Sequence, residues 1–304
     1  MMMSYKLFNR KIDLLIDDGN GDGLDLSQFD VSFKVEKTPL AEPNKATISI
    51  YNLTATTASQ LMKEFKIVTL QAGYEGSYGV IFKGNITRSV FGKPNATDTM
   101  LTIECGDGER GYNFGLINKT LAAGATAKDR QAIIAEGLNV EVGHSDETTI
   151  IKSSRGSVFF GMAKDFMRKE AKTSKVDVSI QDGVLQFVDV AGTTPTQAVL
   201  LSSDTGMIGS PTRGEETITV KSLLNPIFKI GGRVKIDEQG AGLDQFNGTY
   251  KILKITFSGE TYGNEWYATL VCRDTSDLRI KKKPKAEPKK KTKSTQKQEV
   301  ETDE

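Results

Sequence analysis

Ala46-Thr47-Ile48-Ser49-Ile50-Tyr51-Asn52-Leu53 has a counterpart later in the chain, Glu216-Thr217-Ile218-Thr219-Val220-Lys221-Ser222-Leu223. In both segments β-branched residues alternate with polar ones, which is the period of a strand with one buried face. Further segments match at nearly the same separation along the chain: 66–70 with 232–236, 82–86 with 246–250, and 101–107 with 269–274, which places Cys105 and Cys272 at matching strand ends. Four matches at nearly one separation indicate an internal duplication.

The residues around the first copy predict more strands and one helix. Apolar alternation predicts strands at 13–16, 31–35, 67–72, 80–82, 86–91 and 100–105. A helix is expected over 55–65, capped by Thr54 or Thr56, with Ala58, Leu61, Met62 and Phe65 on its apolar face. Short strands separated by turn signals are typical of a small barrel or sandwich.

The region between the two copies has a different pattern. Helices are expected over 127–136, ending at Gly137, and from Ser157 onward, with Val158, Met162 and Phe166 on one stripe. The turn Asp182-Gly183 between two alternating runs predicts a β-hairpin with a type I′ turn. Residues 192–196 are rich in Gly, Thr and Pro, and they predict a linker.

These patterns predict a mainly β protein with a minor α component. Two related β-barrel domains, 1–115 and 196–278, flank an inserted small α+β module at 116–195. Residues 279–304 hold ten basic and five acidic residues and almost no apolar ones, so a disordered basic tail is expected. Such a tail could contact nucleic acid or an acidic partner, or it could simply increase solubility.

Composition excludes several classes of site. The 304 residues include 40 Lys+Arg, 39 Asp+Glu, one His and two Cys, which is too little for a His-rich zinc site or a disulfide scaffold. No apolar run is long enough to span a membrane and no signal peptide is evident, so we expect a soluble protein made inside the cell, without a membrane anchor. The loop between Asp18 and Asp22 resembles the start of a calcium loop, but Phe29 stands where a bidentate Glu belongs, and a hairpin tip explains the same residues.

Motifs for catalysis are missing from the sequence. It contains neither a P-loop nor a G-x-S-x-G elbow. Cys105 and Cys272 are expected to be buried and inert, and His144 is expected in a surface loop. We therefore assign no catalytic, cofactor-binding or metal-binding residue and expect no enzyme.

Several segments of both halves share one further pattern: Gly23-Leu24-Asp25-Leu26-Ser27, the strand from Val31 to Thr38, the run from Pro43 to Leu53, Met207-Ile208-Gly209-Ser210-Pro211-Thr212, Ser222-Leu223-Leu224-Asn225-Pro226, Gly231-Gly232-Arg233-Val234 and Gly248-Thr249-Tyr250-Lys251-Ile252. Together these segments resemble the baseplate hub proteins of contractile-tailed bacteriophages. They are turn glycines, prolines and strand residues, so the resemblance concerns architecture and extends over nearly the whole folded body.

The resemblance implies a structural virion protein of the tail baseplate, made in the host cytoplasm. It implies a homotrimer whose two tail-tube-like barrels per chain form a pseudo-six-fold ring. Such a ring would join a trimeric central spike protein to the hexameric tail tube protein and initiate tube assembly, with the tape measure protein and inner baseplate proteins as further possible partners. DNA would pass through the lumen without specific binding, which a body of net charge −4 outside the tail would favour. The alternatives are another β-rich tail tube or spike-proximal binding protein and, from a different class, a cell-wall hydrolase that uses one of the cysteines.

Overall fold

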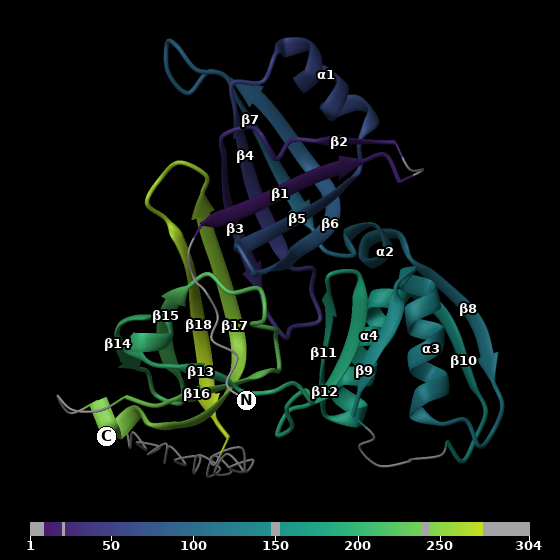
Figure 1. Cartoon of the computed structure of the whole chain (residues 1–304). Helices are drawn as coiled ribbons and strands as arrows, with labels where there is room; N and C mark the ends of the chain where they lie inside the picture. Colours follow the sequence, from purple (N-terminus) through teal and green to yellow (C-terminus); the bar gives the residue numbers. More distant parts are fainter. Residues whose placement is uncertain (1–8, 20–21, 147–152, 239–242, 276–304) are drawn as a thin grey trace, which may run out of the picture.

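The computed structural model describes residues 9–19, 22–146, 153–238 and 243–275 (Figure 1). The first half of the chain contains β1 (Arg10–Asp17), β2 (Gly23–Asp25), β3 (Val31–Lys37), β4 (Lys45–Tyr51), α1 (Ala55–Glu64), β5 (Ile67–Tyr74), β6 (Ser77–Gly92) and β7 (Met100–Gly106). The middle module contains α2 (Glu109–Phe114), β8 (Leu116–Leu121), α3 (Ala127–Leu138), β9 (Glu141–Ser145), β10 (Ser157–Met162), α4 (Ala163–Ser174), β11 (Val176–Gln181) and β12 (Val184–Asp189). The second half contains β13 (Val199–Leu201), η1 (Ser203–Thr205), β14 (Met207–Arg213), β15 (Ile218–Leu223), β16 (Arg233–Ile236), η2 (Leu243–Phe246), β17 (Gly248–Glu260) and β18 (Trp266–Asp274).

The two halves have the same strand order. Neighbouring strands run β3-β4-β7-β6-β5-β1 in the first half and β14-β15-β18-β17-β16-β13 in the second. The halves differ at the end of this series, because β1 pairs with β5 antiparallel whereas β13 pairs with β16 parallel. The expected mainly β fold is therefore confirmed. The division at residues 115, 195 and 278 stays a prediction.

A β-bulge recurs at the same place in both halves. The register between β6 and β7 shifts between Ile86 and Arg88, and the register between β17 and β18 shifts between Ile252 and Lys254. Just before the bulge, Ile86 lies opposite Cys105, and Ile252 lies opposite Cys272. A bulge bends and twists its strand, so both halves turn their sheet at equivalent residues.

The predicted alignment of residues 46–53 with residues 216–223 is wrong by two residues. Ala46 lies opposite Cys105, and Ile218 lies opposite Cys272. Ile218 therefore corresponds to Ala46 and not to Ile48. A slip of two residues leaves every side chain on the same face of the strand, so an alternating pattern cannot reveal it.

The core forms two separate clusters. The larger one contains buried residues from both halves, from Ile12 through Cys105 and from Leu201 through Cys272. The smaller one lies inside the middle module, around Met167, Ile180 and Phe187. The module thus has its own core, whereas the two halves share one.

Three local predictions need correction. Residues 157–162 form strand β10 instead of a helix, since Phe159 is buried while Val158 and Phe160 are exposed, which is the period of a strand. Helix α3 continues past Gly137 to Leu138, and the next residue, Asn139, ends it with a φ of 55°. Gly137 instead allows close contact with Ile117. The strands expected at 80–82 and 86–91 are one long strand, β6.

Other predictions are confirmed. Helix α1 begins after Thr54, whose side chain accepts a hydrogen bond from the Thr57 amide. The hairpin β11–β12 turns at Asp182 and Gly183, both with positive φ, as a type I′ turn requires.

Candidate assembly interface

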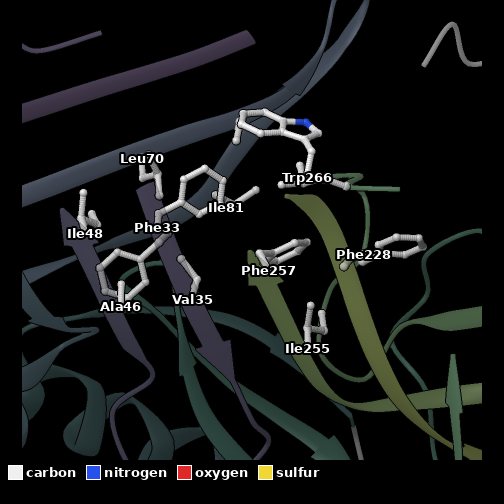
Figure 2. Close-up of a cluster of buried hydrophobic side chains, with 14 of the residues drawn as sticks. Phe33, Val35, Ala46, Ile48, Leu70, Ile81, Phe228, Ile255, Phe257 and Trp266 are labelled. Carbon is white, nitrogen blue, oxygen red and sulfur yellow. The ribbon is translucent and has the colours of Figure 1, made fainter. Parts of the chain in front are cut away.

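Strands β17 and β3 join the two halves into one sheet. Their antiparallel pairing runs from Ile255 opposite Lys37 to Glu260 opposite Ser32. Figure 2 shows the hydrophobic side chains beneath this joint, with Phe33 and Val35 from β3 facing the region of Ile255 and Phe257 from β17. Burial of these side chains provides the main stabilisation of the joint.

Trp266 of the second half is held by residues of the first half. Its ring lies edge-on to Phe33 with 5.6 Å between the ring centroids, and its Nε1 donates a hydrogen bond to the Gly73 carbonyl at 3.2 Å. The guanidinium of Arg10 lies 5.5 Å from the Trp266 ring centroid. Because the indole donor is satisfied and the side chain is almost fully buried, Trp266 fixes how the halves sit relative to each other.

The joint creates a continuous run of strands, β14-β15-β18-β17-β3-β4-β7-β6. One face of the run packs on the core and the other is polar. On the polar face, Glu36 pairs with Lys34 at 2.8 Å and with Lys254, across the joint, at 3.3 Å. Arg88 lies 3.6 Å from Glu104 on the same face. Cations and carboxylates are therefore interleaved along this surface.

Both ends of the run have an open edge in the described part of the chain. The pairing of β6 with β5 ends where the Ile86 amide donates a hydrogen bond to the Lys66 carbonyl. The pairing of β17 with β16 ends in the same way, where the Ile252 amide donates to the Gly232 carbonyl. Beyond that point β17 pairs with β3, whereas residues 89–92 of β6 pair only with β7. At the other end, β14 pairs only with β15. Open strand edges are templates for pairing with another chain.

A buried polar cluster attaches the hairpin turn of the middle module to both halves. Asp107 accepts hydrogen bonds from the amides of Asp182 (2.5 Å) and Gly183 (2.9 Å). The Asp182 carboxylate bonds Lys37 Nζ at 2.5 Å and Lys229 Nζ at 3.1 Å. Lys37 comes from the first half and Lys229 from the second, so one turn contacts both.

Burial and neighbouring charges shift the pKa values in this cluster. Burial, together with the nearby Asp182 carboxylate, raises the pKa of Asp107 to about 6. Burial also lowers the pKa of Lys37, against the attraction of Asp182. For Asp182, burial is outweighed by Lys37 and Lys229, so the pKa of its carboxyl is lowered. Asp182 is thus the ionised partner of the two lysines.

A second attachment involves Lys251 on β17. Its buried Nζ donates to the carbonyls of Asp189 (2.9 Å) and Val190 (3.2 Å) and lies 3.3 Å from the Asp177 carboxylate. Attachment at Asp182 and at Lys251 holds the hairpin β11–β12 near both of its ends.

The outer face of the two-stranded sheet β8–β10 carries exposed apolar side chains on β10, opposite the polar residues Asn118 and Thr120 of β8. Phe160 is 77% exposed and Val158 is 70% exposed, and Phe114 and Leu116 beside them are also exposed. An exposed apolar patch of this kind marks a contact surface.

The residues singled out in the sequence lie apart from these contacts. Cys105 and Cys272 are buried free thiols, and burial raises the pKa of each to about 12, as expected for inert cysteines. His144 lies on strand β9 and not in a loop, with its Nε2 2.9 Å from Asp146. The turn after Asp17 is the tip of the β1–β2 hairpin, and Asn20 and Gly21 lie outside the described residues.

Two general findings concern metals and membranes. Within the described ranges, no three His, Cys, Asp or Glu side chains gather as metal ligands would. Among the helices of those ranges, none is both long and apolar enough to cross a membrane.

A family model that matches most of the chain identifies the family of this protein. A family model described as baseplate hub gp41 matches residues 12–272, which includes both halves and the middle module. The chain belongs to this family. Membership makes the hub chain a structural component of the phage tail baseplate, and so of the virion. No curated protein sequence matches the hub chain.

Solved structures share the fold of the hub chain. The 43 kDa tail protein of prophage MuSo2 from Shewanella oneidensis is similar with a TM-score of 0.62 and 10% identity, over 89% of the hub chain and 98% of the other. A tail protein from Neisseria meningitidis MC58 gives a TM-score of 0.59 at 9% identity, over 88% and 97%. A type VI secretion component from E. coli, described as similar to T4 tail proteins gp27 and gp5, gives 0.55 at 12% identity, over 87% and 77%. At these identities the likeness concerns the fold alone.

Sequence reasoning missed the joint and the buried polar cluster of the hub chain. The Gly106-Asp107-Gly108 and Asp182-Gly183 turns were visible, but their contact spans 75 residues. A carboxylate placed between glycines after a buried strand is a weak signal for such a contact. The pairing of β17 with β3 had no local signal.

Proposed function

We propose that this hub chain assembles as a homotrimer whose six β halves form a pseudo-six-fold ring. The ring adapts the trimeric central spike protein to the hexameric tail tube protein and provides the surface on which the tube starts. The observation that carries this proposal is the shared strand order and shared bulge of the two halves. Three chains with two similar halves each can offer six-fold contacts on one side and three-fold contacts on the other.

The polar face of the strand run is proposed to line the lumen. Strands and helix α1 cover the opposite, apolar face, so the polar face is the one left free for water. DNA is proposed to pass here without specific binding, since the lysines and arginines at Lys34, Lys254 and Arg88 are paired with carboxylates. The tape measure protein and inner baseplate proteins remain further proposed partners, and synthesis in the host cytoplasm belongs to the same proposal.

The proposed role is structural and not catalytic. Both cysteines, which a cell-wall hydrolase would need as nucleophiles, are buried with raised pKa values. Cell-wall turnover that is abolished by Cys105→Ala or Cys272→Ala would contradict this proposal.

The test is the mass of the complex. The full chain, alone and co-expressed with the spike protein of the same tail, is measured by light scattering and native mass spectrometry. Three copies of the chain per complex are expected. A monomer in every mixture would refute the ring, and six-chain rings or filaments of the chain alone would favour the alternative, a tube-like protein.

A further inference from the structure

We infer that the middle module binds an acidic segment of another protein of the tail particle, one that also carries bulky apolar side chains. The binding surface is the module patch, which consists of Phe114, Leu116, Val158 and Phe160, together with the exposed cations of helix α4. The ring proposed above assigns no role to this surface.

The module patch contains most of the strongly exposed apolar side chains of the hub chain. Five large hydrophobic side chains in the described ranges are 70% exposed or more, and the module patch holds four of them. The fifth, Tyr262, lies in the loop between β17 and β18. The two phenylalanines alone present on the order of 200–400 Å² of ring surface. A patch of this size is comparable to the largest on a typical monomer, and such patches are often functional.

The backbone brings the four side chains together on one side of the sheet β8–β10. Val158 and Phe160 lie two residues apart on β10 and therefore share a face. Phe160 lies opposite Asn118, so Leu116, two residues from Asn118, is its diagonal neighbour on that face. Phe114, at the end of α2, comes two residues before Leu116. The four side chains thus form one surface.

The cations of α4 begin beside the module patch. The Ala163 amide, at the start of α4, donates a hydrogen bond to the carbonyl of Gly115, which lies between α2 and β8. Tyr112 of α2 then positions the first two cations. Lys164 Nζ lies 5.5 Å and the Arg168 guanidinium 5.6 Å from its ring centroid, and Arg168 donates a hydrogen bond to its hydroxyl. Positive charge is therefore held directly next to the apolar side chains.

The positive charge of α4 is not balanced within the module. Lys169 and Lys172 are exposed, and neither has an ion-pair partner among the described residues. Glu170 of the same helix is buried and lies 3.0 Å from Arg130, so Asp165 is the exposed carboxylate of α4. The cations of the polar face, in contrast, are interleaved with carboxylates. An excess of unpaired lysines favours a partner that brings carboxylates.

A protein segment fits this surface better than a lipid bilayer or DNA does. The polar side chains Asn118 and Thr120 lie on the same face, opposite Phe160 and Val158. Insertion into lipid would bury these polar groups without hydrogen-bond partners, whereas a protein segment can supply the partners. DNA offers phosphates to the lysines but little apolar surface to the module patch. Carboxylates combined with apolar side chains match both parts of the surface.

The module patch lies on the side of the module that is free in the hub chain. The hairpin β11–β12 attaches the module to both halves through Asp182 and Lys251. Figure 1 shows β8 and β10 on the opposite side of the module. Helix α3 covers the inner face of this sheet, where Gly137 contacts Ile117. A partner can therefore reach the outer face without displacing either attachment.

A photoreactive side chain tests the contact in the assembled tail. p-Benzoylphenylalanine replaces Phe160 in the full chain, and tails that contain it are purified, irradiated and mapped by mass spectrometry. A cross-link is expected to one other tail protein, in a segment with apolar side chains in which carboxylates outnumber Lys and Arg. The same photoreactive residue in place of Tyr262, which is equally exposed, is the matched control and should not cross-link to that segment.

The affinity of the cross-linked protein for the full hub chain is then measured by fluorescence anisotropy. Phe160→Ser should weaken binding about 10- to 100-fold, as expected when an aromatic side chain no longer becomes buried. Tyr262→Ser should leave the affinity unchanged. Both side chains are exposed, so neither change should alter urea unfolding of the chain.

Charge reversal tests the cations separately from the apolar side chains. Lys169→Glu with Lys172→Glu should weaken binding about tenfold at low salt and flatten its salt dependence. Lys63→Glu with Lys66→Glu makes the same change in charge at exposed residues on and next to α1 and should have no such effect. Equal weakening by both pairs would overturn a specific role of α4.

Other outcomes would overturn the inference in distinct ways. Absence of a cross-link from position 160, or a cross-link to a second copy, to DNA or to a segment with an excess of cations, would contradict the proposed partner. Binding of the chain to phosphatidylglycerol vesicles that is abolished by Phe160→Ser would assign the module patch to lipid. Phe160→Ser should leave three chains per complex, so the ring and this contact fail in different measurements. Loss of the trimer in this variant would make the module patch a contact between copies.

Discussion

Asp107 should make the stability of this chain fall as the pH rises from weakly acidic to neutral. Its carboxyl is completely buried and has a pKa of about 6 in the folded state, against 3.8 as the ordinary value. Between these values the folded chain binds more protons than the unfolded chain. The stabilising contribution of the protonated carboxyl is therefore complete below pH 3.8 and is lost as the pH rises through 6.

The magnitude follows from the shift. One pKa unit corresponds to about 1.4 kcal/mol, so the complete loss is about 3 kcal/mol, of which about 2 kcal/mol falls between pH 4.5 and 7. Asp107→Asn removes the titration but keeps one oxygen that can accept a bond from the Asp182 or Gly183 amide. The difference in unfolding free energy, native chain minus variant, should therefore decrease by about 2 kcal/mol over this pH range.

Urea unfolding at several pH values measures this difference. Trp266, the single tryptophan, is buried at the joint and reports unfolding by fluorescence. Asp204→Asn, at an exposed carboxylate, is the matched control. A difference for Asp107→Asn that stays constant or increases with pH would refute the reasoning, because the buried carboxyl would then not be the group that holds its proton.

Three further outcomes are expected from the same contacts. Lys37→Met should destabilise the chain by about 3–5 kcal/mol in urea unfolding, and adding Asp182→Asn, which suits the positive φ there, should restore part of the loss; no recovery would contradict a direct pair. Phe257→Ala should lower the free energy of unfolding by about 3–5 kcal/mol in the same assay. Phe91→Ala should lower it clearly less in the monomer, because Phe91 is only partly buried, and equal losses would contradict the open edge at β6. The two cysteines should react with a thiol reagent at pH 8 only as fast as the chain unfolds, and faster labelling would contradict their burial.

Local patterns predicted most strands but not where they continue or end. Strands are expected at 80–82 and 86–91, yet β6 runs through the residues between them. Gly84 there packs against the Gly106 backbone, where a Cβ would lie 2.6 Å from the carbonyl oxygen. At 157–162 the helical spacing of Val158 and Met162 predicts a helix, but Val158, Phe159 and Phe160 form a consecutive apolar run, which periodicity alone does not assign to a helix or a strand. Pairing with β8 makes this segment a strand.

Contacts between distant segments could be predicted only in part. The duplication was visible because side-chain alternation survives in both halves, although its register was ambiguous by two residues. Which strands face each other across the joint depends on complementary edges such as those of β3 and β17, and the local sequence carries no record of this pairing. The net charge of the body likewise could not predict how charges are arranged on the polar face, where Lys34, Arg88 and Lys254 lie among the carboxylates.

The joint between β17 and β3 has a consequence for the order of events in assembly. Two separate molecules that associate lose translational and rotational freedom, at a cost of about 4–15 kcal/mol per encounter. In the proposed ring, every second contact between neighbouring halves lies within one chain. Such a contact already exists when the chain has folded, because the covalent chain and a shared core hold its two halves together. Two encounters then bring three chains into one ring, whereas six single-domain subunits would need five. Starting a tube is the step at which too few neighbours are present to offset that cost, and a chain that arrives with one contact already made is suited to start it.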